Sequence, residues 1–282
     1  MAGNVSLEKI VSMTGDLPPM PNVAAKVMEM MSNPVMDGKS MQKIISTDQA
    51  LASKILKIAN SALYSFSKEI TSLSHAISII GFNTITSLVI ASSTKNAFFK
   101  GKMGLQDEMI WEHSLASAFG CRALAKMVLG AGKMETAFLS GLLHDIGKIV
   151  LSKKISDQYS SIVQDAFNSK TTIYDIEKKE LGFTHAEVGS LVAKQWRLPG
   201  VIEECIQCHH NSESAKTSKA TVEIVDALNY ICSKIGYSLV SNEDLDLMQV
   251  PIIQKFFKSD NELKNFIREL VSTVEEQKAL FA

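Results

Sequence analysis

The chain has 282 residues, of which 46% are hydrophobic and 21% are charged, close to ordinary globular usage. This length holds one large helical domain or two smaller ones, and the composition excludes a disordered or fibrous protein. The formal net charge of -1 creates no field that would attract nucleic acid or an anionic membrane surface, so neither is expected as a partner.

The N-terminal third predicts a series of helices. Only six prolines occur, and three of them lie in the segment LPPMP at 17–21, interpreted as an extended arm that packs on the surface. Apolar residues then recur at helical spacing within 23–31, 44–58 and 77–89. Asp48 is placed to cap the helix LASKILKIAN, because its carboxylate can accept from a free amide of the first turn.

A second block of helices begins near Gln106. An apolar stripe runs to Gly130 and carries His113. One helix is then expected over Glu135 to Ser152, apolar on most sides, with His144 and Asp145 near its middle. Further helices are expected at 156–168, 172–180, 184–196, 200–210, 217–235 and 261–280. Alternation typical of strands is nearly absent, so the fold class is all-α.

Nothing in the sequence indicates export or a membrane. The cysteines, too few for a disulfide framework in a chain of this length, are Cys121, Cys205, Cys208 and Cys232. The first residues, MAGNVSLEKIVSM, lack a basic and then apolar signal region, and the most apolar stretch, 76–93, is interrupted by Gly81. We therefore expect a cytoplasmic protein without a transmembrane segment.

Histidines and acidic residues gather in the second block. The members of this set are His113, His144, Asp145, His185, His209, His210 and Asp226. Imidazole nitrogens and carboxylate oxygens suit divalent transition metals, and seven such ligands exceed the needs of one ion. Two ions held close together activate water and bind both oxygens of a phosphoester.

Each of these residues also has an ordinary structural interpretation. A single histidine against an apolar face is more often a core residue that bonds a carbonyl. An unpaired Asp145 inside an apolar helix is costly unless a cation or several donors compensate it. Lys148 follows Asp145 on the same helical face and could meet a phosphate, although a solvated lysine is an equal alternative.

The segment LLHDIGKIVL resembles the signature of the HD superfamily of metal-dependent phosphohydrolases, in which the histidine and aspartate pair binds the metal. The segments WEHSLASA, THAEVGSLVAKQW and HHN are similar to the additional histidines of the HD-GYP branch, and Asp226 resembles the closing aspartate. This resemblance implies that all seven residues are metal ligands, and it places Asp145 and Lys148 at a catalytic centre. The cofactor it implies is a divalent transition metal, two ions of iron, manganese, zinc or nickel.

The region before this signature resembles the HDOD family, segment by segment. The matching stretches are LPPMPNVAAKVMEMM, IISTDQALASKILKIANSALYS and ITSLSHAISIIGFNTITSLV. The resemblance covers about residues 13–210 and implies a multi-helical HDOD bundle. Within it we expect an N-terminal helical part at 1–100, an HD-like core with the metal site at 101–238, and a C-terminal helical extension at 239–282.

Two departures from the HD-GYP pattern limit what the resemblance implies. The GYP tripeptide is missing after His210, where the chain continues NSESAKTSK, so recognition of a cyclic dinucleotide by that loop is not implied. Met109 stands where some relatives have a glutamate, four residues before His113, so a third metal is not expected.

Three functions remain open at this stage. The favoured hypothesis is a non-catalytic module of bacterial signal transduction that keeps its metal site and engages a signalling protein or a nucleotide second messenger. The alternative is a metal-dependent phosphohydrolase acting on a nucleotide or cyclic dinucleotide, with Lys148 steadying a phosphate oxygen. The third is a metal centre that senses redox state or oxygen.

The segment CIQCH offers a competing interpretation. Its spacing from Cys205 to His209 matches covalent attachment of c-type haem, which requires export. Zinc held by the same residues is a further possibility, but a structural zinc site usually needs a knuckle rather than a continuous helix. Both are less favoured than the HD interpretation.

Overall fold

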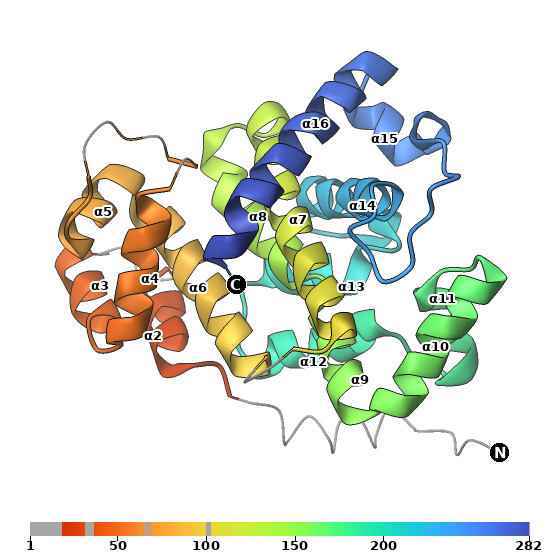
Figure 1. Ribbon diagram of the computed structural model, residues 1–282, viewed down its shortest axis with the longest axis horizontal. Helices are drawn as coiled ribbons and strands as arrows, with labels where there is room; N and C mark the ends of the chain where they lie inside the picture. The colour runs from red at the N-terminus through yellow and green to blue at the C-terminus, as the bar shows by residue number, and fades with distance from the viewer. Residues whose placement is uncertain are drawn as a thin grey trace. The chain divides into compact units, whose positions relative to one another are not determined.

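The computed structural model describes residues 19–31, 37–61, 63–64, 66, 69–99 and 103–281. Throughout these ranges the regular elements are helices and no strand occurs (Figure 1), which confirms the all-α prediction. The chain forms two compact units, which we call the larger unit, residues 103–270, and the smaller unit, the described residues from 19 to 99 together with 271–281. Residues 239–282, expected as one extension, are divided between the units at residue 270.

The smaller unit is organised around its longest helix. Its helices are α2 (Asn22–Met31), α3 (Gly38–Ile45), α4 (Gln49–Ala59), α5 (Leu73–Ile80) and α6 (Phe82–Phe98), with the last turns of α16 (Asp260–Gln277) and a short 3-10 turn at Lys278–Leu280. Helices α2, α4 and α5 pack on α6. Because α6 is buried on most of its circumference, it carries apolar residues all round rather than a single stripe.

Local signals in the smaller unit act as predicted. The Asp48 side chain accepts from the amide of Leu51 at 3.0 Å, which confirms the cap on α4. Gly81 separates α5 from α6 with a φ of 93°, a backbone conformation that glycine adopts without steric cost. In the described part of the chain no single helix is long and apolar enough to cross a membrane, and α5 with α6 meets that test only as a pair bent by 118°.

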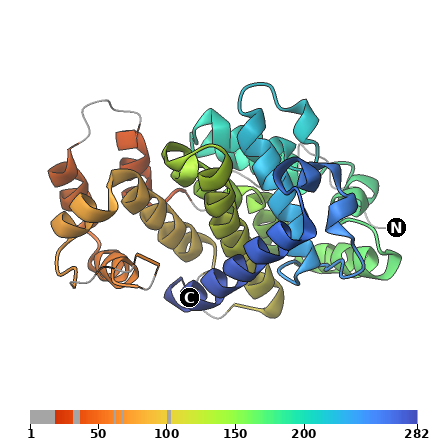
Figure 2. The same ribbon diagram turned by 90° about the horizontal axis from the view of Figure 1, so that it is seen from above.

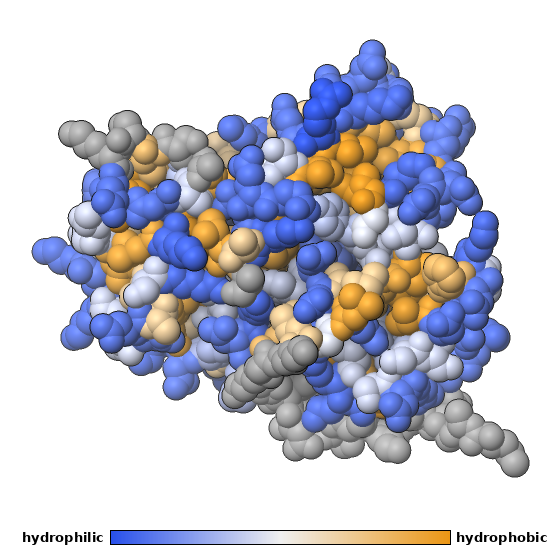
Figure 3. Space-filling view, in the orientation of Figure 1, coloured by the Kyte–Doolittle hydropathy of each residue, from blue (hydrophilic) through white to orange (hydrophobic). Residues whose placement is uncertain are grey.

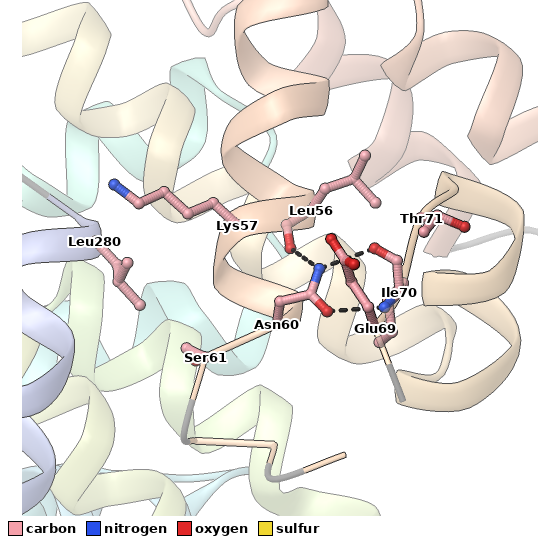
Figure 4. Close-up of a pocket in the computed structure, with 8 residues that line it drawn as sticks. All are labelled: Leu56, Lys57, Asn60, Ser61, Glu69, Ile70, Thr71 and Leu280. Atoms are coloured by element: carbon pink, nitrogen blue, oxygen red, sulfur yellow. Dashed lines mark hydrogen bonds between the residues drawn. The ribbon is translucent and has the colours of Figure 1, made fainter. Parts of the chain in front are cut away.

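The smaller unit has a surface pocket at the end of α4 (Figure 4). Its lining residues are Leu56, Lys57, Asn60, Ser61, Glu69, Ile70, Thr71 and Leu280. The Asn60 amide donates to the carbonyls of Leu56 at 2.9 Å and Ile70 at 2.8 Å and accepts from the Ile70 amide at 2.8 Å. Asn60 therefore anchors the chain before α5 to the end of α4.

The larger unit contains the remaining helices. They are α7 (Leu105–Val128), α8 (Met134–Leu143), α9 (Ile146–Lys154), α10 (Ser156–Ser169), α11 (Ile173–Glu180), α12 (His185–Gln195), α13 (Gly200–Cys208), α14 (Lys219–Lys234), α15 (Pro251–Phe256) and the first turns of α16. These helices lie within a few residues of those predicted, with two exceptions: α15 was not expected, and α8 and α9 stand where one helix was predicted. Pro251 opens α15 at its first position, where a missing amide hydrogen costs nothing.

The core of the larger unit depends on close approaches at two glycines. Helices α7, α8 and α14 pack together (Figure 2), and α12 packs on both α9 and α13. A Cβ at Gly141 would lie 2.6 Å from the carbonyl oxygen of Ser117, and one at Gly147 would lie 1.9 Å from that of His185. Glycine at these positions lets α8 meet α7, and α9 meet α12, at backbone distance.

The single helix predicted over Glu135 to Ser152 is wrong. Helix α8 ends at Leu143 and α9 begins at Ile146, with His144 and Asp145 in the turn between them. Asp145 has φ −99° and ψ 15°, and the amide of Lys148 bonds its carbonyl at 2.9 Å, three residues back. The break places both polar side chains at a helix junction instead of on one helical face.

Some large hydrophobic side chains lie on the surface, whereas some polar side chains of the larger unit are buried. On the face shown in Figure 3, hydrophobic patches lie among hydrophilic residues. Large exposed hydrophobic side chains among the described residues include Leu105, Met127 and Phe167, while His144 and Asp145 are fully buried. Ionisable side chains of the larger unit therefore lie in its interior rather than on its surface.

Candidate metal centre

All the predicted ligands except Asp226 meet inside the larger unit. His113 comes from α7, His144 and Asp145 from the turn between α8 and α9, and His185 opens α12; His209 and His210 follow α13. The side chains of His144, Asp145, His185 and His209 are 0% exposed, and His113 is 3% exposed. Four separate segments of the chain thus direct imidazoles and one carboxylate into one buried region.

The first set of ligand atoms, which we call the His113 group, consists of His113, His144 and Asp145. His113 Nε2 lies 3.1 Å from His144 Nε2 and 3.1 Å from Asp145 Oδ2. His144 Nε2 lies 3.4 Å from the same carboxylate oxygen. Three potential ligand atoms therefore surround one small volume.

The second set, the His185 group, consists of His185, His209 and His210. His185 Nε2 lies 3.2 Å from His209 Nε2 and 3.0 Å from His210 Nε2. The other oxygen of Asp145, Oδ1, lies 3.3 Å from His185 Nε2 and 3.5 Å from His209 Nε2. One carboxylate thus faces both groups, with a different oxygen toward each.

The hydrogen bonds of the outer ring nitrogens decide where the protons are. His113 Nδ1 faces the carbonyl of Tyr237 at 2.6 Å, His144 Nδ1 that of Gly141 at 2.7 Å, and His209 Nδ1 that of Ile206 at 2.9 Å. A carbonyl only accepts, so each Nδ1 carries a proton, and a ring in its neutral form then has its lone pair on Nε2.

This arrangement fits a cation. Lone pairs on Nε2 atoms 3.1 Å apart, as in His113 and His144, repel each other unless a positive charge lies near both. Asp145 Oδ1 is also buried and accepts no hydrogen bond, which is costly for a carboxylate oxygen away from water. Neutral imidazoles held through Nδ1, with a carboxylate among them, are the donor set of divalent transition metal sites.

The ionisation states of four members of the set, His144, Asp145, His209 and His210, agree with it. The pKa of His185 is instead raised, because the effect of burial is outweighed by the charge of Glu177. Burial lowers the pKa of His144 well below its ordinary value despite the opposing charge of Asp145, and burial likewise lowers the pKa of His209 and His210. Burial would raise the pKa of Asp145, but His144 and Lys148 outweigh it and hold that pKa well below the ordinary value. Neutral histidine and ionised aspartate are the forms that bind metal.

Lys148 belongs to the centre rather than to the surface. Its side chain is buried, and Nζ lies 2.7 Å from Asp145 Oδ2. The alternative of a solvated lysine is therefore wrong, because α9 turns this face toward α12. A role of Lys148 in catalysis stays a prediction.

Sequence reasoning missed Glu177, which is 0% exposed. Its Oε2 accepts from the His185 amide at 2.7 Å and from His185 Nδ1 at 2.6 Å, and its Oε1 accepts from the Tyr159 hydroxyl at 2.9 Å. The available signal was its place on the buried face of α11 beside Ile173 and Ile176. The charged run around it, DIEKKE, is typical of a solvated helix and hides this signal.

Asp226 lies in neither group. Its Oδ2 accepts from the Ser212 hydroxyl at 2.6 Å, and burial raises its pKa to about 6. Its role as a metal ligand stays a prediction.

The cysteines of CIQCH do not join the centre. Cys205 and Cys208 lie on the continuous helix α13, and both are buried. Burial raises the pKa of Cys205 to about 12, as expected for a thiol packed in the core. In the described ranges the candidate ligand groups contain histidine and aspartate only.

Comparisons with known proteins agree with the all-helical fold and with the resemblance to the HDOD family. The family model of the HDOD domain matches residues 17–212. The fold is similar to an HDOD domain protein of unknown function from Geobacter sulfurreducens, with a TM-score of 0.79 and 24% identity over 96% of this chain and 95% of that one. It is also similar to a protein from Shewanella amazonensis SB2B whose name assigns it provisionally to the phosphohydrolases, with a TM-score of 0.76 and 24% identity over 99% of this chain and 100% of that one.

A curated relative extends beyond this chain. An uncharacterized protein from Treponema pallidum (strain Nichols) is 22% identical over 269 residues, which is 92% of this chain and 50% of the relative. The chain thus spans about half the length of the curated relative that it matches.

Proposed function

The chain belongs to the HDOD family, and from this premise we propose that it is a regulatory module of bacterial signal transduction built around a buried metal centre. One observation carries the proposal: imidazole Nε2 atoms converge on both oxygens of Asp145 inside the buried core. Without a cation, this region would hold repelling lone pairs and an unsatisfied carboxylate oxygen.

The residues that would hold the metal are those of the two groups, with Asp145 shared between them. Their nitrogen and oxygen atoms suit iron, manganese, zinc or nickel, and there is a donor set for each of two ions. Bound there, a divalent ion would supply the positive charge that the converging atoms lack.

Burial of the centre favours regulation over turnover. The ligands come from α7, the α8–α9 turn, α12 and the end of α13, so metal binding would tie these segments together and stabilise their packing. The ammonium of Lys148 already pairs with Asp145, and the side chains of His144 and His185 are closed to water. Metal occupancy would thus control the rigidity of the larger unit, which a signalling protein or a nucleotide second messenger would read.

A second candidate is a metal-dependent phosphohydrolase, and Lys148 favours it. A buried ammonium beside the shared carboxylate could hold a phosphate oxygen. His210 is less buried than the other histidines of the centre and packs against Tyr174 with ring centroids 4.6 Å apart. A substrate would therefore approach from the side of His210.

Hydrogen exchange and hydrolysis together separate the two candidates. Protein freed of metal and then loaded with Mn²⁺ should show slower amide exchange in α7, α9, α12 and α13, and no phosphodiester turnover above that of Asp145→Asn. Turnover of bis(p-nitrophenyl) phosphate or a cyclic dinucleotide that disappears in Asp145→Asn would overturn the regulatory role in favour of the enzyme. Exchange rates indifferent to Mn²⁺ would contradict both.

A further inference from the structure

The outer ring nitrogens of the centre are held in two different ways. His113, His144 and His209 donate from Nδ1 to backbone carbonyls, which carry no net charge. His185 instead donates from Nδ1 to a carboxylate, that of Glu177, at 2.6 Å. A carboxylate behind a ligating histidine makes the ring a stronger donor than a carbonyl does.

Glu177 is a buried carboxylate that accepts from three donors. They are the amide and the Nδ1–H of His185 and the hydroxyl of Tyr159. The other two buried charges of the centre, Asp145 and Lys148, lie 2.7 Å apart and neutralise each other. A cation in the His185 group would therefore lie beside two carboxylates, that of Asp145 directly and that of Glu177 through the His185 ring.

The two oxygens of Asp145 differ in their hydrogen bonding, and this difference also favours a cation in the His185 group. Oδ2, which faces the His113 group, already accepts from Lys148 Nζ at 2.7 Å. Oδ1, which faces His185 and His209, accepts no hydrogen bond. A cation entering the His185 group meets a free carboxylate oxygen, whereas one entering the His113 group must displace or oppose an ammonium.

The geometry points to Glu177 as a positioning residue that makes the His185 group, completed by Asp145 Oδ1, the first of the two groups to bind a divalent cation. This inference rests on the proposed metal centre and adds to it an order of occupancy. The His113 group, which faces Lys148, binds the second and weaker ion.

The variant Glu177→Gln removes the carboxylate but keeps the shape of the side chain, so it tests the effect of the carboxylate alone. The amide oxygen can still accept from both His185 donors, and the amide nitrogen can donate to the Tyr159 hydroxyl, which can turn to accept. The matched control is Glu187→Gln, because Glu187 caps the same helix through the Thr184 amide at 2.8 Å without contacting the His185 ring. Both variants lose one negative charge near the start of α12.

The test is a titration of metal-free protein with Co²⁺ against a competing chelator, followed by the visible absorption of the bound ion. Glu177→Gln should weaken the first Co²⁺ by about 10-fold to 100-fold and shift its absorption bands, while Glu187→Gln binds like the unaltered protein. The metal-free Glu177→Gln protein should unfold at a temperature no lower than Glu187→Gln does. Equal first affinities for the two variants would overturn the inference.

A second pair of variants keeps the test decisive if Glu177→Gln fails to fold. His113→Ala should keep the first Co²⁺ with nearly unchanged affinity, whereas His210→Ala should weaken it strongly. The opposite order would overturn the inference while leaving the metal centre intact. An unaltered protein that binds no Co²⁺ would instead remove the metal centre itself.

Discussion

The two compact units place polar side chains in opposite ways. The larger unit buries full charges, among them Asp145, Lys148 and Glu177. The buried polar side chains described in the smaller unit are neutral, mostly hydroxyls of α6 such as Thr86 and Ser92. Burying a charged side chain is costly unless other groups compensate it. The gathering of such side chains in the larger unit therefore indicates that the functional site lies there.

Charged residues in the smaller unit serve its edges. Asp48 caps α4, and Lys57 and Glu69 line the open pocket at the end of that helix. In Figure 4 the amino group of Lys57 points away from Asn60 toward Leu280. The smaller unit thus offers surface for contacts, while the larger unit offers an interior for a metal.

The largest expected difference between the units concerns metal affinity. Asp145→Asn keeps the side-chain shape but removes the carboxylate shared by both groups, so metal affinity should fall by about 100-fold or more. Asp48→Asn makes the same chemical change in the smaller unit and should leave affinity unchanged. Isothermal titration with Mn²⁺ measures both, and similar affinities for the two variants would erase the contrast.

Backbone contact should also differ between the units. Gly147→Ala puts a Cβ 1.9 Å from the His185 carbonyl oxygen, so α9 and α12 must separate at a cost of about 3 kcal/mol or more. In the smaller unit, Gly38→Ala meets only the Ile77 side chain, at 3.3 Å, and should cost less than about 1 kcal/mol. Urea unfolding of both variants checks this, and equal losses would show that the close approach is not required.

Asp226 tests the cost of a buried charge in the metal-free protein. Its pKa is raised from 3.8 to about 6, so its contribution to stability is present below pH 3.8 and is lost as the pH rises through 6. Asp226→Asn should therefore raise the free energy of unfolding by about 3 kcal/mol at pH 7.5 and leave it unchanged at pH 3.5.

Chemical denaturation at the two pH values measures that gain. Repeating it with Mn²⁺ tests whether Asp226 is a ligand, because a ligand replaced by asparagine would turn the gain into a loss. If Asp226→Asn were no more stable than the unaltered protein at pH 7.5, burial of the ionised Asp226 carboxylate would not destabilise the fold.

The smallest expected effect lies in the smaller unit. Asp48→Ala removes the bond to the Leu51 amide and should cost about 1 kcal/mol of stability with no change in metal content. Thermal unfolding and metal analysis of one preparation check both halves of this expectation. A loss of metal would mean that the units are coupled more tightly than their separate cores suggest.

The sequence predicted the helices well because their signals are local. Apolar spacing and the cap at Asp48 act within a few residues and do not depend on distant contacts. The break between α8 and α9 was not predicted, because buried apolar residues continue on both sides of it.

The sequence named the side chains that meet in the two groups more completely than the residues that hold those side chains in place. Histidine spacing and the resemblance of LLHDIGKIVL named the residues that now meet, but the sequence did not show which oxygen of Asp145 faces which histidines. Glu177 escaped notice because an acidic residue on an amphipathic helix is ordinarily solvated, and only the packing of α11 buries it. Residues such as Glu177, which support the candidate ligands, are brought there by tertiary packing, and the sequence does not show that packing.

Elemental analysis of protein purified without added metal tests the central claim most directly. The buried convergence of His113, His144, His185 and His209 on Asp145 predicts about one to two divalent transition metal ions per chain, and almost none in Asp145→Asn. A metal-free unaltered protein that also fails to take up metal on dialysis, or equal metal content in the two proteins, would contradict it.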